Sequence, residues 1–544
     1  MRLQTLFAVL GVLIGCGDNL HGDPDDPIAG DAAPHIHIVT PARGTFAGDV
    51  THVLVTGTVS DDSGRVIAVT VNNEPAVHGD DGTWLANVAV TPGTNLVHAI
   101  AIDERRNEGS ETRAVVVGPM VALERRVAGG IRTTLSAQAL SALGRDSASS
   151  IETGGLVAAA QDRNPVVDVG NTGCSYARAS ITSLIVGNAE VQLQPTTGGI
   201  AVSTVLDDVS IGMHLQWADS CVDGTRETVV SAARVTVGGR ALVGIAGGRF
   251  DVQLAEPSVQ VTGIERELTD VPDPVVQMLD LDAEVGAALG SSKERLVVPM
   301  LGRALATYVE SKTVDVDGVP VDVEVAPAQI AFTPDGGTLT LDTALLAHGG
   351  KGPFVFVPNS APTLDLTSGL SLAVADDAAN QLLASLWSAG AFDQRIELAA
   401  APISELYDSV QLELAVPPHV EATGTPLELT IGDWVATFRR GNAVAATVAI
   451  HGRSALFVVV ENGRLRMDVS TPAVEVDVIG TRTLAKAERE EIELFALEHV
   501  RAAGAAAVDA IPLPSIAGTS LTTPWVDPRL GYLLVSGNVP EGSR

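Results

Sequence analysis

Short runs of alternating apolar and polar residues recur along the chain from residue 35 onward and predict many β-strands. In the first 84 residues of this stretch, 35–118, turns rich in Asp, Gly, Asn and Pro separate the runs. Run length and spacing of this kind are typical of a small β-sandwich. The predicted strands are 35–39, 53–59, 66–71, 83–90 and 96–102.

Residues 119–330 combine a strand-rich stretch with two helical segments. Apolar residues at helical spacing predict a first helix capped by Thr133 or Thr134. A second helical zone covers 283–311, in which Pro299 and Gly302 predict a break. The apolar faces of these helices carry Leu135, Leu140, Leu143, Leu301, Leu305 and Val309. The strands predicted between the helices are 179–186, 189–193, 200–205, 209–217, 228–237 and 249–261.

Residues 331–544 repeat this arrangement. A helix is predicted over 376–389, because acidic residues favour its N-terminus and Gly390 can end it. Strands are predicted from 395 to 479, then a long helix over 483–509 and a final strand over 530–539. Two such halves in tandem predict two similar barrels, so the expected fold is mainly β with long helices.

The N-terminus has the pattern of a lipoprotein signal peptide. Arg2 precedes an apolar run, 3–14, which is too short to span a bilayer as a helix. The run ends in Leu13-Ile14-Gly15-Cys16, where small residues admit a peptidase and the cysteine thiol can accept diacylglycerol. We therefore expect removal of 1–15 and anchoring of the chain to a membrane through Cys16. The alternatives are an ordinary signal peptide and an uncleaved anchor.

Residues 16–34 contain few large apolar side chains and are rich in Asp, Gly and Pro. Such a segment cannot bury enough surface to fold, so it is predicted to be a disordered tether. Gly17 stands where many inner-membrane lipoproteins carry a retaining aspartate. The expected location is therefore the bacterial cell envelope, at the outer membrane.

Composition narrows the function classes. The formal net charge of -32 argues against a nucleic-acid partner, which requires a basic surface. Aromatic residues make up only 3% of the chain, so the core must consist of Val, Leu, Ile and Ala. With Cys16 lipidated, Cys174 and Cys221 can form a disulfide in an oxidising compartment; two free buried thiols are the alternative.

Catalytic signatures are missing from the sequence, including Gly-x-Ser-x-Gly, His-Glu-x-x-His, the phosphate-binding Gly-x-x-x-x-Gly-Lys-Ser/Thr and Cys-x-x-Cys. His35 and His37 share one face of a predicted strand, but no third metal ligand lies nearby. We therefore expect no enzyme activity, no cofactor and no metal site.

Residues 35–118 resemble bacterial Ig-like modules that include domain B of glucodextranase. The resemblance rests on Val71-Asn72-Asn73, Asp81-Gly82-Thr83-Trp84, Pro92-Gly93-Thr94-Asn95 and Ala101-Ile102-Asp103. Such modules are mostly spacers, so the resemblance implies an Ig-like β-sandwich and no binding residues.

Three segments of the remaining chain resemble the family of bactericidal/permeability-increasing protein, lipopolysaccharide-binding protein and cholesteryl ester transfer protein. Residues 370–392 are similar to the segment that opens the C-terminal barrel, with Asn380, Leu383, Leu386, Trp387 and Gly390 at the family's spacing. Residues 130–140 look like the opening of the N-terminal barrel, and residues 511–539 look like the closing segment. The resemblance implies two barrels over 119–330 and 331–544, each a twisted antiparallel sheet wrapped on a long helix, joined by a central sheet.

This resemblance implies non-catalytic binding and transfer of phospholipid-like lipids, with acyl chains in apolar tunnels. The candidate lipid-binding residues are Leu135, Leu140, Leu143, Leu301, Leu305, Val309, Leu383, Leu386 and Trp387. Expected partners are lipids and, through the anchor, a membrane; the sequence identifies no protein partner. A surface adhesin or scaffold with filled barrels is the alternative, and a hydrolase ranks third.

The sequence departs from the family in two respects. Only four lysines occur, whereas lipopolysaccharide-binding members carry a lysine-rich tip, so endotoxin neutralisation is not expected. The cysteine pair also stands elsewhere, because Cys221 precedes the second helical zone. We expect a local disulfide within the N-terminal half.

Overall fold

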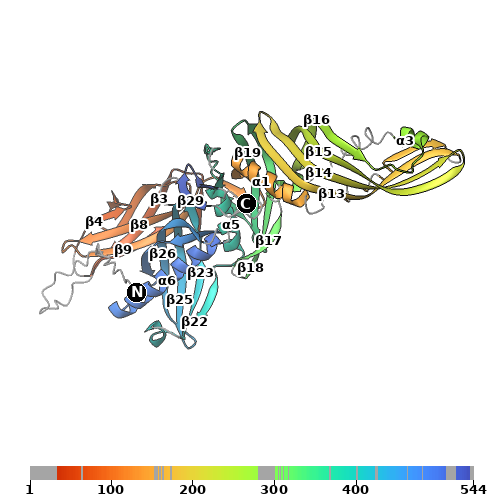
Figure 1. Cartoon of the computed structure of the whole chain (residues 1–544). Coiled ribbons are helices and arrows are strands. Elements are labelled where there is room, and N and C mark those ends of the chain that lie inside the picture. Colours follow the sequence, from red (N-terminus) through yellow and green to blue (C-terminus); the bar gives the residue numbers. More distant parts are fainter. Residues whose placement is uncertain are drawn as a thin grey trace, which may run out of the picture. The chain divides into compact units, whose positions relative to one another are not determined.

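Strands make up most of the computed structural model shown in Figure 1. The alternating sequence pattern therefore identified the fold as mainly β. The structure describes residues 33–538 apart from 63–64, 152–156, 158–160, 162–163, 172–173, 280–300, 304, 307, 310, 317, 367–368, 400–401, 423–426, 462–463, 481 and 510–521.

Residues 35–117 form two sheets. One contains β1 (His35–Thr40), β3 (His52–Ser60), β7 (Thr83–Ala89) and β6 (Val77–His78) in that order. The other contains β2 (Thr45–Gly48), β9 (Glu108–Val117), β8 (Gly93–Asp103), β4 (Val66–Val71) and β5 (Glu74–Pro75). Alternate residues of β3 and β7 are buried, among them Val55 and Trp84. All five predicted strands are confirmed, and β2, β5, β6 and β9 are additions.

The chain forms two compact units. The smaller comprises the chain up to Thr40, Val55–Ala86 and His98–Glu111. The larger comprises Pro41–Leu54, Asn87–Val97 and the chain from Thr112. The ends of several sandwich strands therefore belong to the larger unit.

The first long sheet of the larger unit is antiparallel throughout. Its order is β12 (Val167–Asn171), β13 (Ser175–Thr196), β14 (Gly199–Asp219), β15 (Val222–Ala246) and β16 (Arg249–Arg266). The two strands predicted over 179–193 form one continuous strand, β13. The two strands predicted over 200–217 likewise form one strand, β14. The pairing keeps one register across the predicted breaks, from Val186↔Val209 to Asn188↔Asp207, so neither strand ends there. The register shift in this pair of strands lies earlier, between Ile181 and Ser183, and a bulge of this kind bends a strand without ending it.

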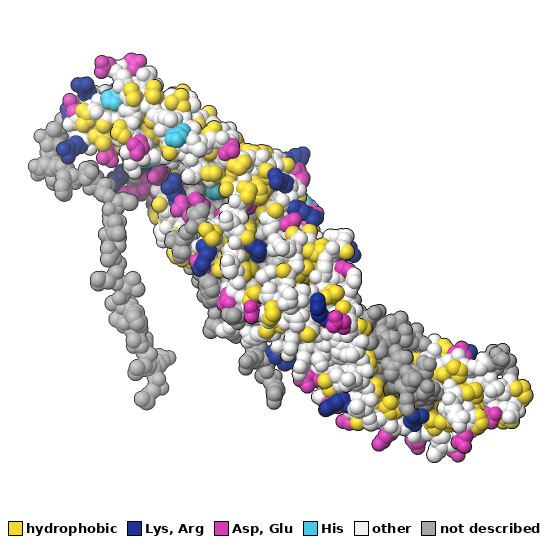
Figure 2. Space-filling view, turned by 90° about the horizontal axis from the view of Figure 1, so that it is seen from above, with side chains coloured by type: hydrophobic (Ala, Val, Ile, Leu, Met, Phe, Trp, Pro, Cys, Tyr) yellow, Lys and Arg dark blue, Asp and Glu magenta, His cyan; other side chains and the backbone are white. Residues whose placement is uncertain are grey.

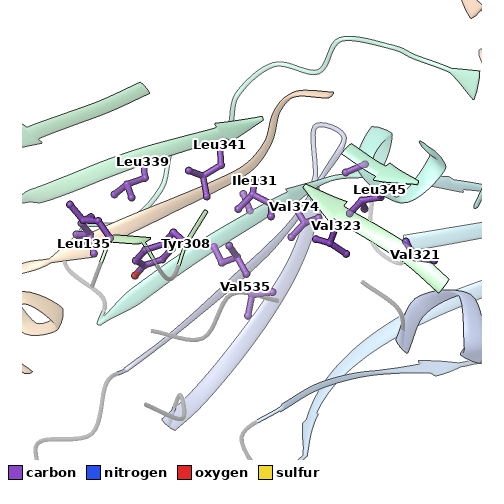
Figure 3. Close-up of a cluster of buried hydrophobic side chains, with 14 of the residues drawn as sticks. Ile131, Leu135, Tyr308, Val321, Val323, Leu339, Leu341, Leu345, Val374 and Val535 are labelled. Carbon is purple, nitrogen blue, oxygen red and sulfur yellow. The ribbon is translucent and has the colours of Figure 1, made fainter. Parts of the chain in front are cut away.

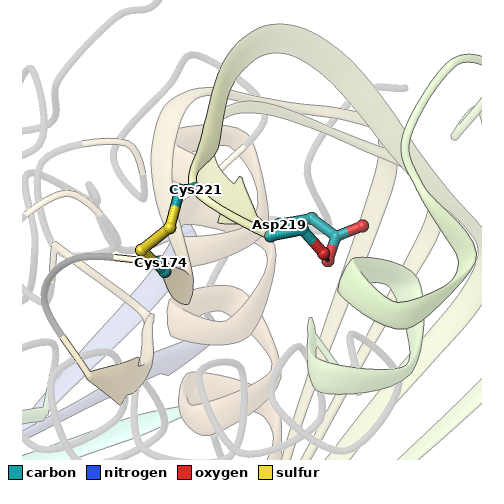
Figure 4. The surroundings of a disulfide bond; sticks show 4 residues. Cys174, Asp219 and Cys221 are labelled. Atoms are coloured by element: carbon teal, nitrogen blue, oxygen red, sulfur yellow. Dashed lines mark hydrogen bonds between the residues drawn. A yellow bond between two sulfur atoms is a disulfide. The ribbon is translucent and has the colours of Figure 1, made fainter.

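A disulfide joins Cys174 to Cys221, as expected from the cysteine count (Figure 4). Ser220 and Cys221 both adopt positive φ, 52° and 65°, in the two-residue turn between β14 and β15. Right-handed strand twist favours this turn conformation. The backbone N–H of Cys221 also donates to the Cys174 carbonyl at 3.2 Å. The bond is therefore local, between two neighbouring turns of one sheet.

A seven-stranded central sheet combines strands from both halves. Its order is β17 (Lys312–Val316), β18 (Val319–Thr333), β19 (Gly336–Ala347), β11 (Val127–Ser136), β21 (Leu370–Ala375), β30 (Tyr532–Asn538) and β29 (Thr522–Arg529). Strand β18 spans the expected boundary at residue 330. A separate two-stranded sheet pairs β10 (Met120–Ala122) with β20 (Pro353–Val355).

A third sheet of the larger unit lies in the C-terminal half. Its main path is β22 (Gln394–Glu397), β23 (Ser409–Leu414), β25 (Leu427–Arg440), β26 (Ala443–Glu461) and β27 (Arg464–Val469). Strand β24 (His419–Glu421) pairs with β25, and β28 (Ala473–Val478) pairs with β26. The strands predicted between 395 and 479 are thus confirmed.

Within the described residues, the helices with defined bounds are α1 (Ala137–Ser150), α3 (Asp273–Leu279), α5 (Asp376–Ser388) and α6 (Lys486–Asp509), with a short 3-10 helix, η2 (Pro402–Glu405). Helices α5 and α6 confirm the predictions over 376–389 and 483–509. Gly390, with φ 80°, follows α5 as expected. Helix α3 was not predicted, and most of the predicted zone 283–311, with Pro299, lies outside the described residues.

The predicted start of the first helix is wrong. Ser136 caps α1 by accepting the Ala139 N–H at 3.1 Å, and Thr133 and Thr134 belong to strand β11. Because β11 pairs with β19 on one side and β21 on the other, both residues take part in sheet pairing rather than in a cap. Leu135 therefore lies on a strand and not on a helix face.

Candidate functional site

The candidate lipid-binding residues converge on one continuous apolar core. Six are buried and three are partly buried. The buried ones are Leu135, Leu140, Leu301, Leu305, Leu383 and Leu386, and the partly buried ones are Leu143, Val309 and Trp387. The structure thus brings residues from both halves of the sequence into one apolar cluster, rather than into two separate ones.

One face of the central sheet forms the middle of this core (Figure 3). Ile131 of β11 pairs with Leu341 of β19 on one side and with Val374 of β21 on the other, and Leu135 lies farther along β11, opposite Gly337. Tyr308 belongs to the same cluster of buried side chains. Tyr308 therefore contributes its ring to the apolar cluster on this face of the central sheet.

Three hydroxyl groups in this core lack a hydrogen-bond partner within the described part of the chain. They are those of Thr133, Thr343 and Tyr308, each on a residue at most 5% exposed. A buried hydroxyl without a partner costs about 1–3 kcal/mol relative to a satisfied one. Burial also raises the pKa of the Tyr308 phenol, so this group stays a hydrogen-bond donor.

Side-chain direction places the Thr133 hydroxyl on the same face of the central sheet as Ile131 and Leu135. Residues 131–136 of β11 pair regularly, so Ile131, Thr133 and Leu135 point to the same side of the central sheet. Ile131 and Leu135 are members of the cluster that includes Tyr308. The Thr133 hydroxyl therefore lies on the apolar face on which Tyr308 packs.

Helix α5 carries the candidate residues of the second half of the sequence, and polar contacts fix this helix on several sides. The Gln381 amide donates to the carbonyls of Leu123 and Arg125 at 2.6 and 2.8 Å and accepts the Leu345 N–H at 3.0 Å. Asn380 exchanges two hydrogen bonds with the backbone of Val420. Satisfied buried networks rigidify their surroundings. The apolar residues around α5 thus lie in a tightly constrained part of the core.

Trp387, at the end of α5, is similarly constrained. Its indole N–H donates to the Leu414 carbonyl at 2.6 Å, and its ring centroid lies 5.9 Å from that of Phe46. A buried indole N–H usually has such a partner. Trp387 therefore has a packing role in the structure.

Two adjacent acids stand at the start of α5. Burial raises the pKa of Asp376 to about 6 and that of Asp377 to about 7, against hydrogen bonds that favour the charged forms. Asp376 accepts from the Asn359 amide at 2.6 Å and from the Ala422 N–H at 3.1 Å. Asp377 accepts the Val357 N–H at 3.0 Å. The charge of Asp376 adds to the rise in the pKa of Asp377, and the charge of Glu421 adds to that of Asp376.

We expect Asp377→Asn to stabilise the protein at pH 8 by about 2 kcal/mol, with little effect at pH 4. An acid whose pKa is raised on folding holds its proton in the folded state while the unfolded chain releases it. Stability therefore falls as pH rises from about 4 to about 7, and the amide removes this loss. Urea unfolding at pH 4 and at pH 8 measures the change in the free energy of unfolding. The exposed Asp335→Asn is the control, and equal effects of the two variants would contradict the prediction.

A cluster of buried charges, which sequence analysis missed, lies within the larger unit around Asp433. This side chain is 0% exposed and forms an ion pair with Arg43, and it accepts the Ala114 N–H at 3.1 Å. Its own N–H donates to Nδ1 of the buried His451 at 3.2 Å. Nε2 of His451 lies 3.4 Å from a carboxylate oxygen of Asp477.

A bulge in β25 positions this cluster. The pairing of β25 with β26 shifts between Ile431 and Trp434, and Asp433 adopts a positive φ of 50°. A Cβ at the neighbouring Gly432 would lie 2.4 Å from Cβ of Ala114, so only glycine allows this approach. No local pattern in the sequence indicates that Arg43 and Asp433, 390 positions apart, form a pair.

The family comparison concerns the first module. Residues 34–118 match the model of glucodextranase, domain B. The Ig-like module expected over 35–118 is thus confirmed. A search of curated proteins finds no match.

Solved structures similar to this chain include three proteins. The lipopolysaccharide binding protein is 14% identical, with a TM-score of 0.43, over 76% of this chain and 99% of that chain. P47 of Clostridium botulinum E1 is 8% identical, with a TM-score of 0.27, over 76% of this chain and 100% of that chain. P47 from Clostridium botulinum A2 is 9% identical, with a TM-score of 0.24, over 76% of this chain and 97% of that chain.

Several expected features fall outside the described residues. These are the signal peptide over 1–15, Cys16 with most of the tether, and the opening of the closing segment over 511–521. Among the described residues, no helix is both long and apolar enough to cross a membrane. The same residues contain no group of three or more His, Cys, Asp or Glu side chains arranged to hold a metal ion.

Charged side chains on the face drawn in Figure 2 are mixed in sign. Lys and Arg are scattered singly among acidic and apolar residues, without a continuous basic patch on this view. A surface of this kind provides no strong attraction to phosphate groups.

Proposed function

We propose that the larger unit binds a lipid without catalysis, on the face of the central sheet that carries Ile131, Thr133 and Leu135. The observation that carries this proposal is the Tyr308 hydroxyl, which lies among apolar side chains and has no hydrogen-bond partner within the described residues. A group that is costly to bury unpaired is expected where a ligand supplies its partner. The sequence resemblance to the family of bactericidal/permeability-increasing protein supports a lipid as that ligand.

Energetics also favours a lipid with long chains. An acyl chain of about 16 methylenes gains on the order of 13 kcal/mol on leaving water, at about 0.8 kcal/mol per methylene. This gain requires only apolar contact, which the residues of the central face provide. We propose phospholipid as the class of ligand and transfer between membranes as the activity.

Native mass spectrometry tests the proposal. The chain from residue 17, which retains every described residue, should carry phospholipid after purification from a bacterial host. It should also move a fluorescent phosphatidylcholine between neutral vesicles, with less than a twofold change in rate from about 50 to 200 mM salt, because apolar burial supplies the affinity.

If the protein purifies without lipid and moves no lipid above a protein-free control, both the proposed binding and the proposed transfer are contradicted. Bound lipid without transfer would reduce the proposal to binding.

A scaffold or adhesin with a filled interior is the second candidate. Two observations favour it. Hydrogen bonds of Gln381 hold α5 in place, and Leu383 and Leu386 on this helix are each only 2% exposed. We therefore place lipid in the first half and a filled core in the second. A lipid-free protein of normal stability would favour the scaffold function for the whole chain.

We also propose that Cys16 anchors the protein to the outer membrane of a bacterial cell. The lipobox sequence supports this location. In cells expressing the full chain, Cys16→Ala should move the protein from the membrane pellet to the soluble fraction or stall its processing, which changes its apparent mass. An unchanged pellet fraction at the wild-type mass would contradict anchoring through this residue.

A further inference from the structure

We propose that the Tyr308 and Thr133 hydroxyls donate hydrogen bonds to the ester carbonyl oxygens of a bound diacyl glycerolipid. This inference rests on the proposed function and names its ligand class. It places the ester linkages of the lipid beside the two hydroxyls, on the face of the central sheet that carries Ile131 and Leu135.

The chemistry of the two side chains selects this ligand. Both hydroxyls belong to residues exposed by no more than 5%, and neither has a partner within the described residues. Tyr308 and the two neighbours of Thr133 on its face, Ile131 and Leu135, are members of one apolar cluster. A ligand that satisfies such a site must be apolar over most of its length and offer hydrogen-bond acceptors.

Ester carbonyls of a glycerolipid meet this requirement better than other parts of the molecule. They accept hydrogen bonds, carry no charge and directly join the apolar chains. A phosphate headgroup would bring a charge that neither hydroxyl can neutralise, and burying it unpaired is costly. Because burial raises the pKa of Tyr308, its phenol remains a donor across the physiological pH range.

Competition between an ester and an ether lipid tests the inference. The chain from residue 17 is incubated with vesicles containing equal amounts of diacyl phosphatidylcholine and a dialkyl ether phosphatidylcholine with the same chain lengths. The ether lipid has the same shape but lacks the carbonyl oxygens. Mass spectrometry of the recovered protein gives the ratio of the two bound lipids. We expect roughly a tenfold preference for the ester lipid, as two hydrogen bonds would provide.

Two isosteric variants should remove this preference in steps. Tyr308→Phe and Thr133→Val should each reduce it to about threefold, and the double variant should bind both lipids equally. Neither change should lower the melting temperature of the lipid-free protein, because the two hydroxyls have no partner in the part of the chain that the structure describes. Thr133→Val alone supplies the comparison if Tyr308→Phe folds poorly.

Tyr407→Phe is the matched control. Its hydroxyl is buried but donates to Glu488, so this variant should be less stable and keep the tenfold preference. Equal binding of both lipids by the wild type would overturn the inference and leave the proposed lipid binding intact. If the wild type binds neither lipid, the inference and the proposed lipid binding are both overturned. A fall in the melting temperature of lipid-free Tyr308→Phe would show a protein partner and also overturn the inference.

Discussion

Asp433→Ala is expected to lower the free energy of unfolding of the larger unit by about 3–5 kcal/mol. The change leaves Arg43 without its buried counter-charge and removes the acceptor of the Ala114 N–H. Removing one member of a buried ion pair is costly because the remaining charge cannot regain its hydration. The midpoint of urea unfolding, followed by tryptophan fluorescence, measures the loss.

Two control variants separate this effect from the loss of any ion pair. Glu397→Ala breaks a surface pair in which Arg395 and Glu397 are both well exposed, and should cost less than about 1 kcal/mol. Asp433→Asn keeps an oxygen that can accept the Ala114 N–H, so it should be less damaging than Asp433→Ala. Equal midpoints for Asp433→Ala and Glu397→Ala would show that the buried pair contributes no more than a surface pair.

Gln381→Leu is expected to destabilise the protein by about 3 kcal/mol, although leucine has a similar volume. The change leaves the Leu123 and Arg125 carbonyls and the Leu345 N–H without partners in a buried environment. Thermal unfolding monitored by circular dichroism measures the effect.

Gln394→Leu is the matched control for this substitution. Its amide makes only an exposed contact of 3.4 Å with the Ala391 carbonyl, so its effect should stay within about 0.5 kcal/mol. A Gln381→Leu variant as stable as the wild type would mean that the three backbone groups find water or other partners.

Local pattern predicted much of the fold. The alternation in residues 35–102 located the five sandwich strands, and acids followed by a glycine located α5. Such features depend on residues within a few positions of one another, which is the range over which turns and helix ends are encoded. The disulfide between Cys174 and Cys221 could be predicted because only one pair remained after Cys16.

The candidate site was predicted only in part. The apolar character of Leu140, Leu301 and Leu305 was visible in the sequence, and all three are buried in the core. The error at Thr133 shows the limit: threonine before an apolar run is a good helix cap, but pairing with β19 and β21 keeps it in a strand. Those partners lie more than 200 positions away, so local sequence could not reveal them.

By itself, the sequence determined the mainly β composition, the Ig-like module and the apolar faces, because these depend on residue type and short-range spacing. Only the tertiary structure decided which groups meet across long separations. It joined Arg43 to Asp433 and Gln381 to Leu123, and it placed the Tyr308 hydroxyl among apolar side chains, without a partner in the described part of the chain. The physical reason is that a hydrogen bond or ion pair depends on the final positions of both groups, and the folded sheets set these positions.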